Sequence, residues 1–470
     1  MNMTTKEAYL AAIAADLKVF TKHAFNTIFP DKEFLDNWHV DAIIHHLELC
    51  MKGEMPRLII NMPPRHLKSF IASVVLPAFI LSRDPSAKII CISYSDDLAR
   101  MLARDFRRIV ESHWYQKIFT QVRILKTTEN EFVTDKGGFR FATSVGGTLT
   151  GRGGDFIIVD DPIKPEDTMS ERVRQTTNEW YKSTLLSRLD DKKRSVLILV
   201  MQRLHVNDLT GFVESSGGFQ KLSLPAIAPR DEHIAIGTGE FHYRLAGTAL
   251  HEEREGVDTL NNIRNEVGTF NFAAQYQQRP ETPDGSLFKR KWFRIITKPP
   301  EININGYMIV SIDAALSTSD TADYTAISLI YSDNQQHYVL SSERGRWDYE
   351  MLREKALAYV RLYGDQVTFL VEAAGAGISL IQSLRKSGVR CFHHTPRNDK
   401  VTRAALVLPI IQSGRVHIVS RQGHNNWVEP YLNELVNFPN GRFDDQVDSL
   451  VQALRWAEPK VNSKMNVYFY

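Results

Sequence analysis

Apolar side chains recur along the chain with two different periods, and each period predicts a type of secondary structure. Residues 5–24 and 38–51 place Ala, Leu, Ile and Phe at helical spacing, and Gly53 and Pro56 end the second run. We therefore expect two helices before the first strand. Short, nearly continuous apolar runs follow, and such runs are typical of buried parallel strands. These strands are expected at 57–61, 88–93, 156–160 and 195–200.

A second series of apolar runs begins after about residue 285. Its first three runs are separated by short loops, which predicts an antiparallel meander, and a helix and a parallel strand should follow. The four runs lie at 307–313, 326–331, 337–343 and 368–372. Turn-rich sequence and one helical stretch separate the two series. We therefore predict a first α/β domain at 1–204 with a helical lead-in, a linking subdomain at 205–285, and a second domain at 286–470.

Composition agrees with a folded protein of more than one domain. The chain has 470 residues, of which 43% are hydrophobic and 24% charged, so it lacks the composition of a disordered protein. The net charge of +2 does not indicate a strongly basic nucleic-acid binder, so any DNA contact must come from local patches. Cys50, Cys91 and Cys391 lie far apart, which argues against a zinc or disulfide framework and suits a reducing cytoplasm. The charged N-terminal segment predicts neither a signal peptide nor a membrane span.

The first candidate site is a phosphate-binding loop. The strand RLIIN runs into MPPRHLKS (62–69) and then into an apolar helix, which is the context that such a loop requires. Lys68 would reach the β and γ phosphates of ATP, and the Ser69 hydroxyl would hold Mg²⁺. Met62 and Leu67 stand where the standard pattern has glycine, and the alternative is an ordinary turn with a surface lysine. The predicted nucleotide-binding residues are Arg65, His66, Leu67, Lys68 and Ser69.

Two acids at the end of a later strand support that interpretation. In FIIVDDP (156–162), Asp160 would bind Mg²⁺ through water and Asp161 would polarise the attacking water. Most such ATPases have Glu at the second position, and the alternative role of both acids is to cap a turn or a helix. The strand at 195–200 leads to Gln202 and Arg203, where related folds carry the group that senses phosphate release. Gln202 is therefore a candidate nucleotide-sensing residue.

An arginine lies in the glycine-rich loop GGTLTGRGGD, just before the two acids. On such a loop, Arg152 could act as an arginine finger toward the γ phosphate of a neighbouring subunit. A solvated loop cation explains the same residue equally well.

The second candidate site is a set of acids in the C-terminal half. Asp313 and Glu372 end two expected core strands, and further acids occupy a turn and a late helix start. RNase H-like nucleases use this arrangement to hold two divalent ions, and hard oxygen ligands favour Mg²⁺ or Mn²⁺. Each acid alone is better explained by turns or helix capping, so the ordered set makes the case. The remaining acids are Asp320, Asp323, Asp444, Asp445 and Asp448, of which Asp323, Asp444 and Asp445 are the candidate metal ligands.

Two cations precede the late acids on the helical run DKVTRAALVLPII. Lys400 and Arg403 could hold a DNA phosphate near the metals. A solvated helix face explains both residues nearly as well.

Together the motifs resemble those of the large terminase subunits of tailed bacteriophages, in the same order over residues 37–457. They are RLIINMPPRHLKS, FIIVDDP, VMQRLHVNDL, FAAQYQQRP and FDDQVD. The resemblance implies a RecA-like ATPase domain of the additional-strand, conserved-glutamate class with a parallel sheet, joined to an RNase H/RuvC-like nuclease domain with a mixed sheet. It also implies that Arg65 and Lys68 contact phosphates, and that Asp313, Glu372 and Asp445 hold catalytic metal with Asp444 nearby.

By the same resemblance, the protein would package double-stranded viral DNA with ATP and cut concatemers with a metal-dependent endonuclease. Its expected partners are the portal protein of the procapsid, the small terminase subunit and further copies of itself in a pentameric ring, although the isolated chain could be a monomer. It would act in the host cytoplasm, docked transiently on the procapsid. The alternatives are a helicase-nuclease of DNA repair, which needs a second RecA-like domain, and a non-catalytic portal-binding adaptor.

Overall fold

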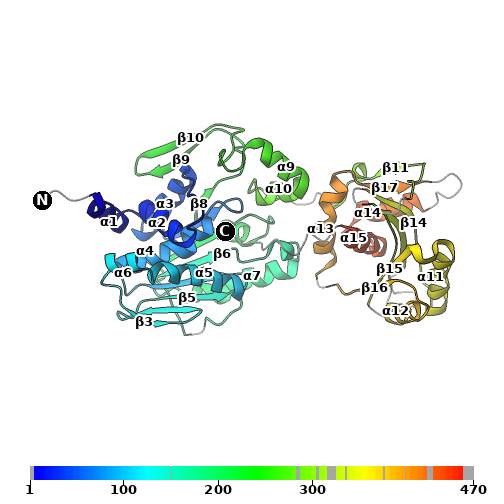
Figure 1. Ribbon diagram of the computed structural model, residues 1–470, viewed down its shortest axis with the longest axis horizontal. Coiled ribbons are helices and arrows are strands. Elements are labelled where there is room, and N and C mark those ends of the chain that lie inside the picture. The colour runs from blue at the N-terminus through cyan, green and yellow to red at the C-terminus, as the bar shows by residue number, and fades with distance from the viewer. Residues whose placement is uncertain are drawn as a thin grey trace. The chain divides into compact units, whose positions relative to one another are not determined.

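The chain forms two compact units in a computed structural model (Figure 1). The first unit holds the described residues up to 264 together with 270–281, and the second holds 265–269 and the described residues from 286 onward. The structure describes residues 5–149, 151–281, 286–302, 306–314, 324–333, 336–373, 376–396, 398–420 and 427–458. Within these ranges no helix is long and apolar enough to cross a membrane.

Three helices precede the first strand: α1 (Thr5–Ala15), α2 (Leu17–Ile28) and α3 (Trp38–Met51). The prediction of one helix over 5–24 was wrong because Asp16 interrupts it. The Asp16 carboxylate accepts hydrogen bonds from the backbone N–H groups of Lys18 (2.7 Å) and Val19 (3.0 Å). This is the bonding of a helix N-cap, so α2 starts anew after α1 ends.

The first sheet has eight strands in the order β3-β4-β5-β2-β6-β7-β1-β8. Every neighbouring pair from β5 to β8 is parallel, and β3 and β4 add an antiparallel edge. One strand, β7, separates the strand that enters the predicted phosphate loop from the strand that ends at Asp160. Their bounds are β1 (Arg57–Asn61), β2 (Lys88–Ser93), β3 (Ile124–Thr127), β4 (Glu131–Thr134), β5 (Phe139–Ser144), β6 (Phe156–Asp160), β7 (Val196–Met201) and β8 (Gln220–Ser223).

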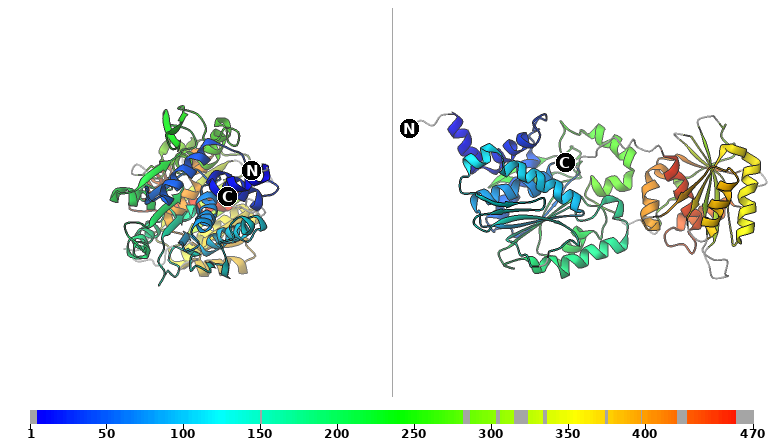
Figure 2. Two further views of the ribbon diagram at one scale, coloured as in Figure 1. Left: turned by 90° about the vertical axis from the view of Figure 1, so that its left-hand side faces the viewer. Right: turned by 60° about the horizontal axis from the view of Figure 1, so that its bottom comes forward.

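Helices cover both faces of this sheet (Figure 2). Side chains alternate along each strand, so that Leu58 and Ile60 of β1 pack against the helices on one face while Ile59 packs on the other. The apolar runs recognised in the sequence are therefore buried on both sides. The helices of the first unit are, besides α1 to α3, the π-helical turn Phe70–Val75, α4 (Leu76–Arg83), α5 (Asp96–Val110), α6 (His113–Ile118), α7 (Glu171–Ser183), α8 (Leu209–Ser216) and, apart from residues 265–269, α9 (Val257–Val267) and α10 (Thr269–Gln275).

The segment from residue 205 to 281 does not form one separate layer. Its strand β8 pairs in parallel with β1 at the edge of the first sheet. Strands β9 (Glu232–Gly237) and β10 (Glu240–Arg244) form an antiparallel hairpin, and α9 and α10 follow. The linking subdomain at 205–285 stays a prediction about domain boundaries.

The second sheet has seven strands in the order β11-β17-β14-β13-β12-β15-β16. The predicted meander is confirmed, because β12, β13 and β14 pair antiparallel while β15 runs parallel to β12. The bounds are β11 (Arg294–Ile296), β12 (Tyr307–Asp313), β13 (Thr325–Ser332), β14 (His337–Gly345), β15 (Val367–Glu372), β16 (Cys391–His394) and β17 (Val416–Val419).

Helices also cover both faces of the second sheet. On one face, Val310 and Ile312 of β12 pack with α11 (Tyr349–Tyr363) and α12 (Ala376–Lys386). On the other face, α15 (Asp445–Ala457) packs on β12, β13 and β14 and contacts α13 (Lys400–Gln412) and α14 (Val428–Asn437). A hydrogen bond of 2.7 Å joins the hydroxyls of Ser328 on β13 and Ser449 on α15. Asp313 alternates with Ile312, so it belongs to the α15 face.

Asp208 should be one of the most costly polar residues to remove from the first unit. It is fully buried, and it accepts bonds from the Arg203 side chain (3.0 and 3.1 Å) and from the backbone of Leu204 and Gly211. Asp208→Ala leaves the buried Arg203 charge with only the more distant Glu214 as a carboxylate partner among the described residues. We expect the free energy of unfolding to fall by about 3–5 kcal/mol in urea titrations.

Glu179 supplies the matched control for that variant. Its exposed carboxylate pairs with Lys182 at 3.4 Å on the surface of α7. Glu179→Ala should leave the urea midpoint almost unchanged, because solvated ion pairs contribute little. If the two variants lost the same free energy of unfolding, the buried Asp208–Arg203 pair would contribute no more stability than an exposed ion pair.

Candidate nucleotide and metal sites

The loop at 62–69 connects β1 to the π-helical turn, as the sequence predicted. Two of its residues have positive φ angles, Arg65 at 61° and Leu67 at 63°. These left-handed residues curl the chain tightly before the helix. Lys68 is buried, with its Nζ atom 3.5 Å from the Pro63 carbonyl oxygen, and Ser69 directly precedes the turn.

Asp160 lies at the end of β6 and is held by two serine hydroxyls. Ser69 Oγ donates to Oδ1 at 2.8 Å, and Ser73 Oγ donates to Oδ2 at 2.7 Å. Burial, and then the neighbouring Asp161 carboxylate, raise the pKa of Asp160 to about 7. A buried carboxylate beside a serine hydroxyl suits Mg²⁺, because a dication would favour the ionised form. The residues present therefore fit a magnesium ion here.

Asp161 connects the end of β6 to the end of β7. It has a φ of 44°, and its carboxylate Oδ1 accepts a hydrogen bond of 3.2 Å from the backbone N–H of Gln202. The side-chain oxygen of Gln202 is buried and has no hydrogen-bond partner in the part of the chain that the structure describes. Asp161 and Gln202, both candidate site residues, thus lie side by side. That side-chain oxygen of Gln202 is available to a ligand or to its water.

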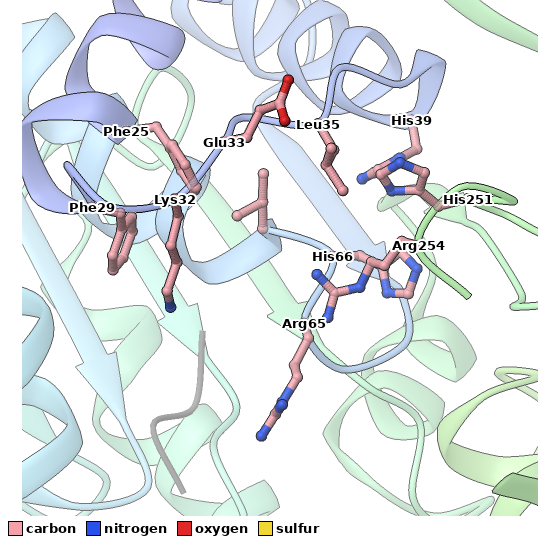
Figure 3. Close-up of a pocket in the computed structure, with 11 residues that line it drawn as sticks. Phe25, Phe29, Lys32, Glu33, Leu35, His39, Arg65, His66, His251 and Arg254 are labelled. Carbon is pink, nitrogen blue, oxygen red and sulfur yellow. The ribbon is translucent and has the colours of Figure 1, made fainter. Parts of the chain in front are cut away.

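A cavity of about 200 Å³ adjoins the same loop (Figure 3). Its walls come from α2, the connection to α3, α3 itself, the loop and residues 251–254. The His39 ring centroid lies 5.5 Å from that of His66 and 5.4 Å from that of His251. Burial lowers the pKa of His39 and of His66, the latter to about 3, so both rings are neutral at neutral pH. The lining residues are Phe25, Phe29, Lys32, Glu33, Leu35, His39, Arg65, His66, Leu67, His251 and Arg254.

Arg152 packs against its own chain. Its Nη1 atom lies 2.5 Å from a Glu131 carboxylate oxygen on β4, and its guanidinium lies 4.3 Å from the Phe141 ring centroid on β5. About a third of the side chain is exposed. The predicted arginine finger is therefore held by an ion pair within the subunit.

In the second unit, acids from two strands and one helix surround two cations. Lys400 Nζ lies 2.6 Å from an Asp444 oxygen and 3.2 Å from an Asp448 oxygen. Arg403 lies 2.6 Å from Asp448 and 3.8 Å from Glu372. Lys400 and Arg403, expected to hold DNA, thus pair with site acids, and their contact with DNA stays a prediction.

Asp313 is electrostatically coupled to this cluster. Burial raises its pKa well above the ordinary value, and the carboxylates of Asp448, Glu372 and Asp445 raise it further, while Lys400 opposes them. Burial and Asp448 likewise raise the pKa of Glu372. Mutual repulsion of this kind is what bound dications relieve, and the all-oxygen donor set fits Mg²⁺ or Mn²⁺.

The cations interleave with the acids, and no three His, Cys, Asp or Glu side chains among the described residues are grouped to hold a metal ion as they stand. Asp445 is buried in the first turn of α15, and Asp444 precedes it. The candidate ligand Asp323 and its neighbour Asp320 lie outside the described residues.

Some site residues were not recognised in the sequence. Ser73 lies one turn after Ser69, and the available signal was a lone polar residue in the apolar run FIASVVLPAFIL. Glu131 and the cavity residues of α2 and α3 had no local signal, because they meet the loop only through long-range contacts. Asp448 was not counted among the candidate metal ligands, but it pairs with both cations and has the largest effect of the neighbouring acids on the pKa of Asp313.

Comparisons with known proteins agree with this architecture. Residues 310–455 match the family model of the terminase RNaseH-like domain. The solved large terminase of a thermophilic bacteriophage, in its crystal form 2, is similar with a TM-score of 0.54 and 10% identity, covering 90% of this chain and 99% of that one. The same terminase in complex with ATP-gamma-S gives a TM-score of 0.52 and 10% identity, covering 88% and 98%. No curated protein matches the sequence.

The fold defines a class of protein: a mainly parallel α/β sheet with β7 between β1 and β6, joined to a mixed sheet in the region that matches the terminase RNaseH-like domain. Within that class, the fold is that of a phage large terminase. The resemblance found in the motifs is thereby confirmed at the level of the fold.

Divalent metal should stabilise the protein through the acid cluster. A metal ion that binds only the folded state raises the free energy of unfolding by about 2.7 kcal/mol when its concentration is a hundred times Kd. We therefore expect Mn²⁺, without nucleotide, to raise the melting temperature of the full chain. Asp313→Asn should remove most of this shift while leaving any contribution of the nucleotide site. A shift of the same size in wild type and variant would exclude the cluster as the metal site.

Proposed function

We propose that this protein is the large subunit of a phage terminase, which hydrolyses ATP to move double-stranded viral DNA into a procapsid and cuts concatemeric DNA as an endonuclease. The proposal rests on one observation: each of the two units has a polar site at the strand ends where its fold would place catalytic residues. One site joins the P-loop helix to Asp160, and the other gathers carboxylates on an RNase H-like sheet.

The first site supports ATP binding and hydrolysis. Lys68 and Arg65 would contact the phosphates, Ser69 and Asp160 would hold Mg²⁺, and Asp161 would orient the attacking water. Gln202, bonded to Asp161 through its backbone, would report the state of the γ phosphate. The thermophilic phage terminase, whose fold is similar, was solved with ATP-gamma-S, which supports an adenine nucleotide as ligand.

The cavity beside the loop is suited to the nucleoside part of that ligand. It combines aromatic rings of Phe25 and Phe29 with neutral histidines, so it can pack against a base and bond to its polar edge. His66 lies in this wall next to His39 and His251, and Leu67 also lines it.

The second site supports metal-dependent DNA cleavage. Asp313 and Glu372 would hold divalent ions with Asp445, Asp444 and Asp448 on the late helix, and Asp323 stays a predicted ligand. Two such ions, when bound, would supply an activated water and stabilise the leaving oxygen. The chain's own contribution is to fix the carboxylates at the ends of β12 and β15 and to balance their charge with Lys400 and Arg403.

The domain assignment and the partners belong to the same proposal. Residues 1–204 would form the ATPase domain, 205–285 the link and 286–470 the nuclease. The partners would be viral DNA, the portal protein, the small terminase subunit and other copies in a ring, in the host cytoplasm. A helicase-nuclease is less well supported, because residues 205–281 add one strand, a hairpin and helices rather than a second RecA-like sheet.

The two activities should be separable by mutation. Lys68→Ala removes the charge that would stabilise the transferring phosphate, so ATP hydrolysis should be abolished while Mn²⁺-dependent plasmid nicking by the purified protein persists. Asp313→Asn should reduce nicking by several orders of magnitude and leave phosphate release intact.

Each of these variants is the control for the other, provided that their melting temperatures show that both are folded. Loss of both activities in either folded variant would contradict two independent sites. Wild-type nicking by Asp313→Asn would leave the second unit as a DNA-binding module without a nuclease site.

Arg152 provides a test of action between subunits. If it serves a neighbour's nucleotide, ATPase activity should rise faster than linearly with protein concentration. Mixing Arg152→Ala with Lys68→Ala subunits should restore some activity, because an interface can then combine an intact loop with an intact arginine. Strictly linear activity without rescue would make Arg152 a structural residue of the Glu131 ion pair.

A further inference from the structure

Three arginines stack on two aromatic rings at one corner of the second unit. The guanidinium of Arg344 lies 4.6 Å from the Phe443 ring centroid and 5.2 Å from that of Tyr324. Arg346 lies 4.6 Å from the Tyr324 ring, and Arg442 lies 5.1 Å from the Phe443 ring. The two rings contact each other edge to face at 4.9 Å. We call these five residues the arginine cluster.

The arginine cluster can bind an anion. Stacking on a ring holds a guanidinium by its face and leaves the N–H groups at its edge for phosphate oxygens. The buried carboxylate of Glu434 pairs with Arg344. Arg442, by contrast, is exposed and has no carboxylate partner among the described residues. Its charge is therefore available to a ligand.

A hollow of about 380 Å³ lies against the cluster. Besides Arg344, Arg442 and Phe443, its walls include the exposed residues Asn433, Asn437 and Asn440. Asparagine side chains are common donors to the phosphates of nucleic acids. The hollow thus offers neutral and cationic donors, which suits a phosphodiester backbone.

The sheet places the cluster next to the carboxylate site. In strand register, Asp313 pairs with Ala326 and Ala326 pairs with Arg344, so the three residues share one face and one row across β12, β13 and β14. Adjacent strands are about 4.8 Å apart, which puts the Arg344 backbone about 10 Å from that of Asp313. At about 3.4 Å per nucleotide, this corresponds to about three nucleotides along one DNA strand.

A buried carboxylate also ties the cluster to α15. Glu434 pairs with Arg344 through one oxygen and accepts a 2.6 Å hydrogen bond from the backbone N–H of Gln446 through the other. Gln446 directly follows Asp445, and its side chain bonds to Ser342 on β14 at 2.7 Å. The cluster is thus fixed to the helix turn that presents the late acids.

We infer that the arginine cluster and its hollow bind the DNA backbone a few nucleotides from the bond that the carboxylate site cuts. This inference rests on the proposed nuclease function for its purpose, although DNA binding itself can be measured without cleavage. Arg442 and Arg346 are positioning residues in this arrangement.

The test measures binding of a labelled duplex to the full chain by fluorescence anisotropy in EDTA, over a series of salt concentrations. Arg442→Ala should weaken binding several-fold at low salt and lower the slope of log K against log salt by about one unit. Arg442→Lys should restore the slope, since the phosphate charge is again neutralised. Arg361→Ala is the matched control, because Arg361 is an exposed arginine on α11, which packs on the opposite face of the sheet, and it should bind like wild type.

Plasmid nicking in Mn²⁺ then separates the two proposals. With an active nuclease, Arg442→Ala should raise KM with kcat nearly unchanged. If every form binds as expected but none cleaves, the DNA surface stands and the nuclease function fails. If Arg442→Ala and Arg346→Ala both keep the wild-type affinity and salt slope, or if the wild type binds no duplex, the inference is overturned.

Discussion

A carboxylate buried at the end of a core strand must be compensated, and this constraint organises both candidate sites. In the first unit, Asp160 is buried at the end of β6, and the hydroxyls of Ser69 and Ser73 bind its two oxygens. Those bonds fix the helical segment that follows the 62–69 loop against the sheet. Hydroxyls compensate only partly, so the pKa stays near 7, and a dication at this site would favour the ionised form.

The second unit meets the same constraint with charge instead of hydroxyls. Burial and then the carboxylates of Asp448 and Glu372 raise the pKa of Asp313, burial and Asp448 raise that of Glu372, and Lys400 and Arg403 lie among these acids. A buried cation among the acids offsets part of their mutual repulsion, and a metal ion would have to compete with that cation for the same carboxylates. This explains why the described acids share a region without being grouped as metal ligands.

The sequence predicted the features that depend on local pattern. Strands with continuous apolar runs, the meander and the acids at strand ends all follow from periodicity, and the structure has them. The cavity beside the loop could not be predicted, since residues 25 and 251 meet there through tertiary contacts. The sequence also did not show which acid of the last helix faces the two cations, because Asp445 and Asp448 are both in its first turn. The packing shows that Asp448 pairs with Lys400 and Arg403. The break at Asp16 shows a local cap overriding a helical period.

The departures from standard motifs also have a physical reading. Leu67 and Asp161 stand where glycine and glutamate are usual, and both have positive φ. A left-handed conformation costs a residue such as leucine about 1–2 kcal/mol, whereas aspartate tolerates it better. Leu67 packs against the core of the first unit and lines the cavity. These apolar contacts, which glycine could not make, offset part of the backbone strain. The loop therefore keeps its curl through packing, and the same leucine forms part of the wall proposed to receive the nucleoside.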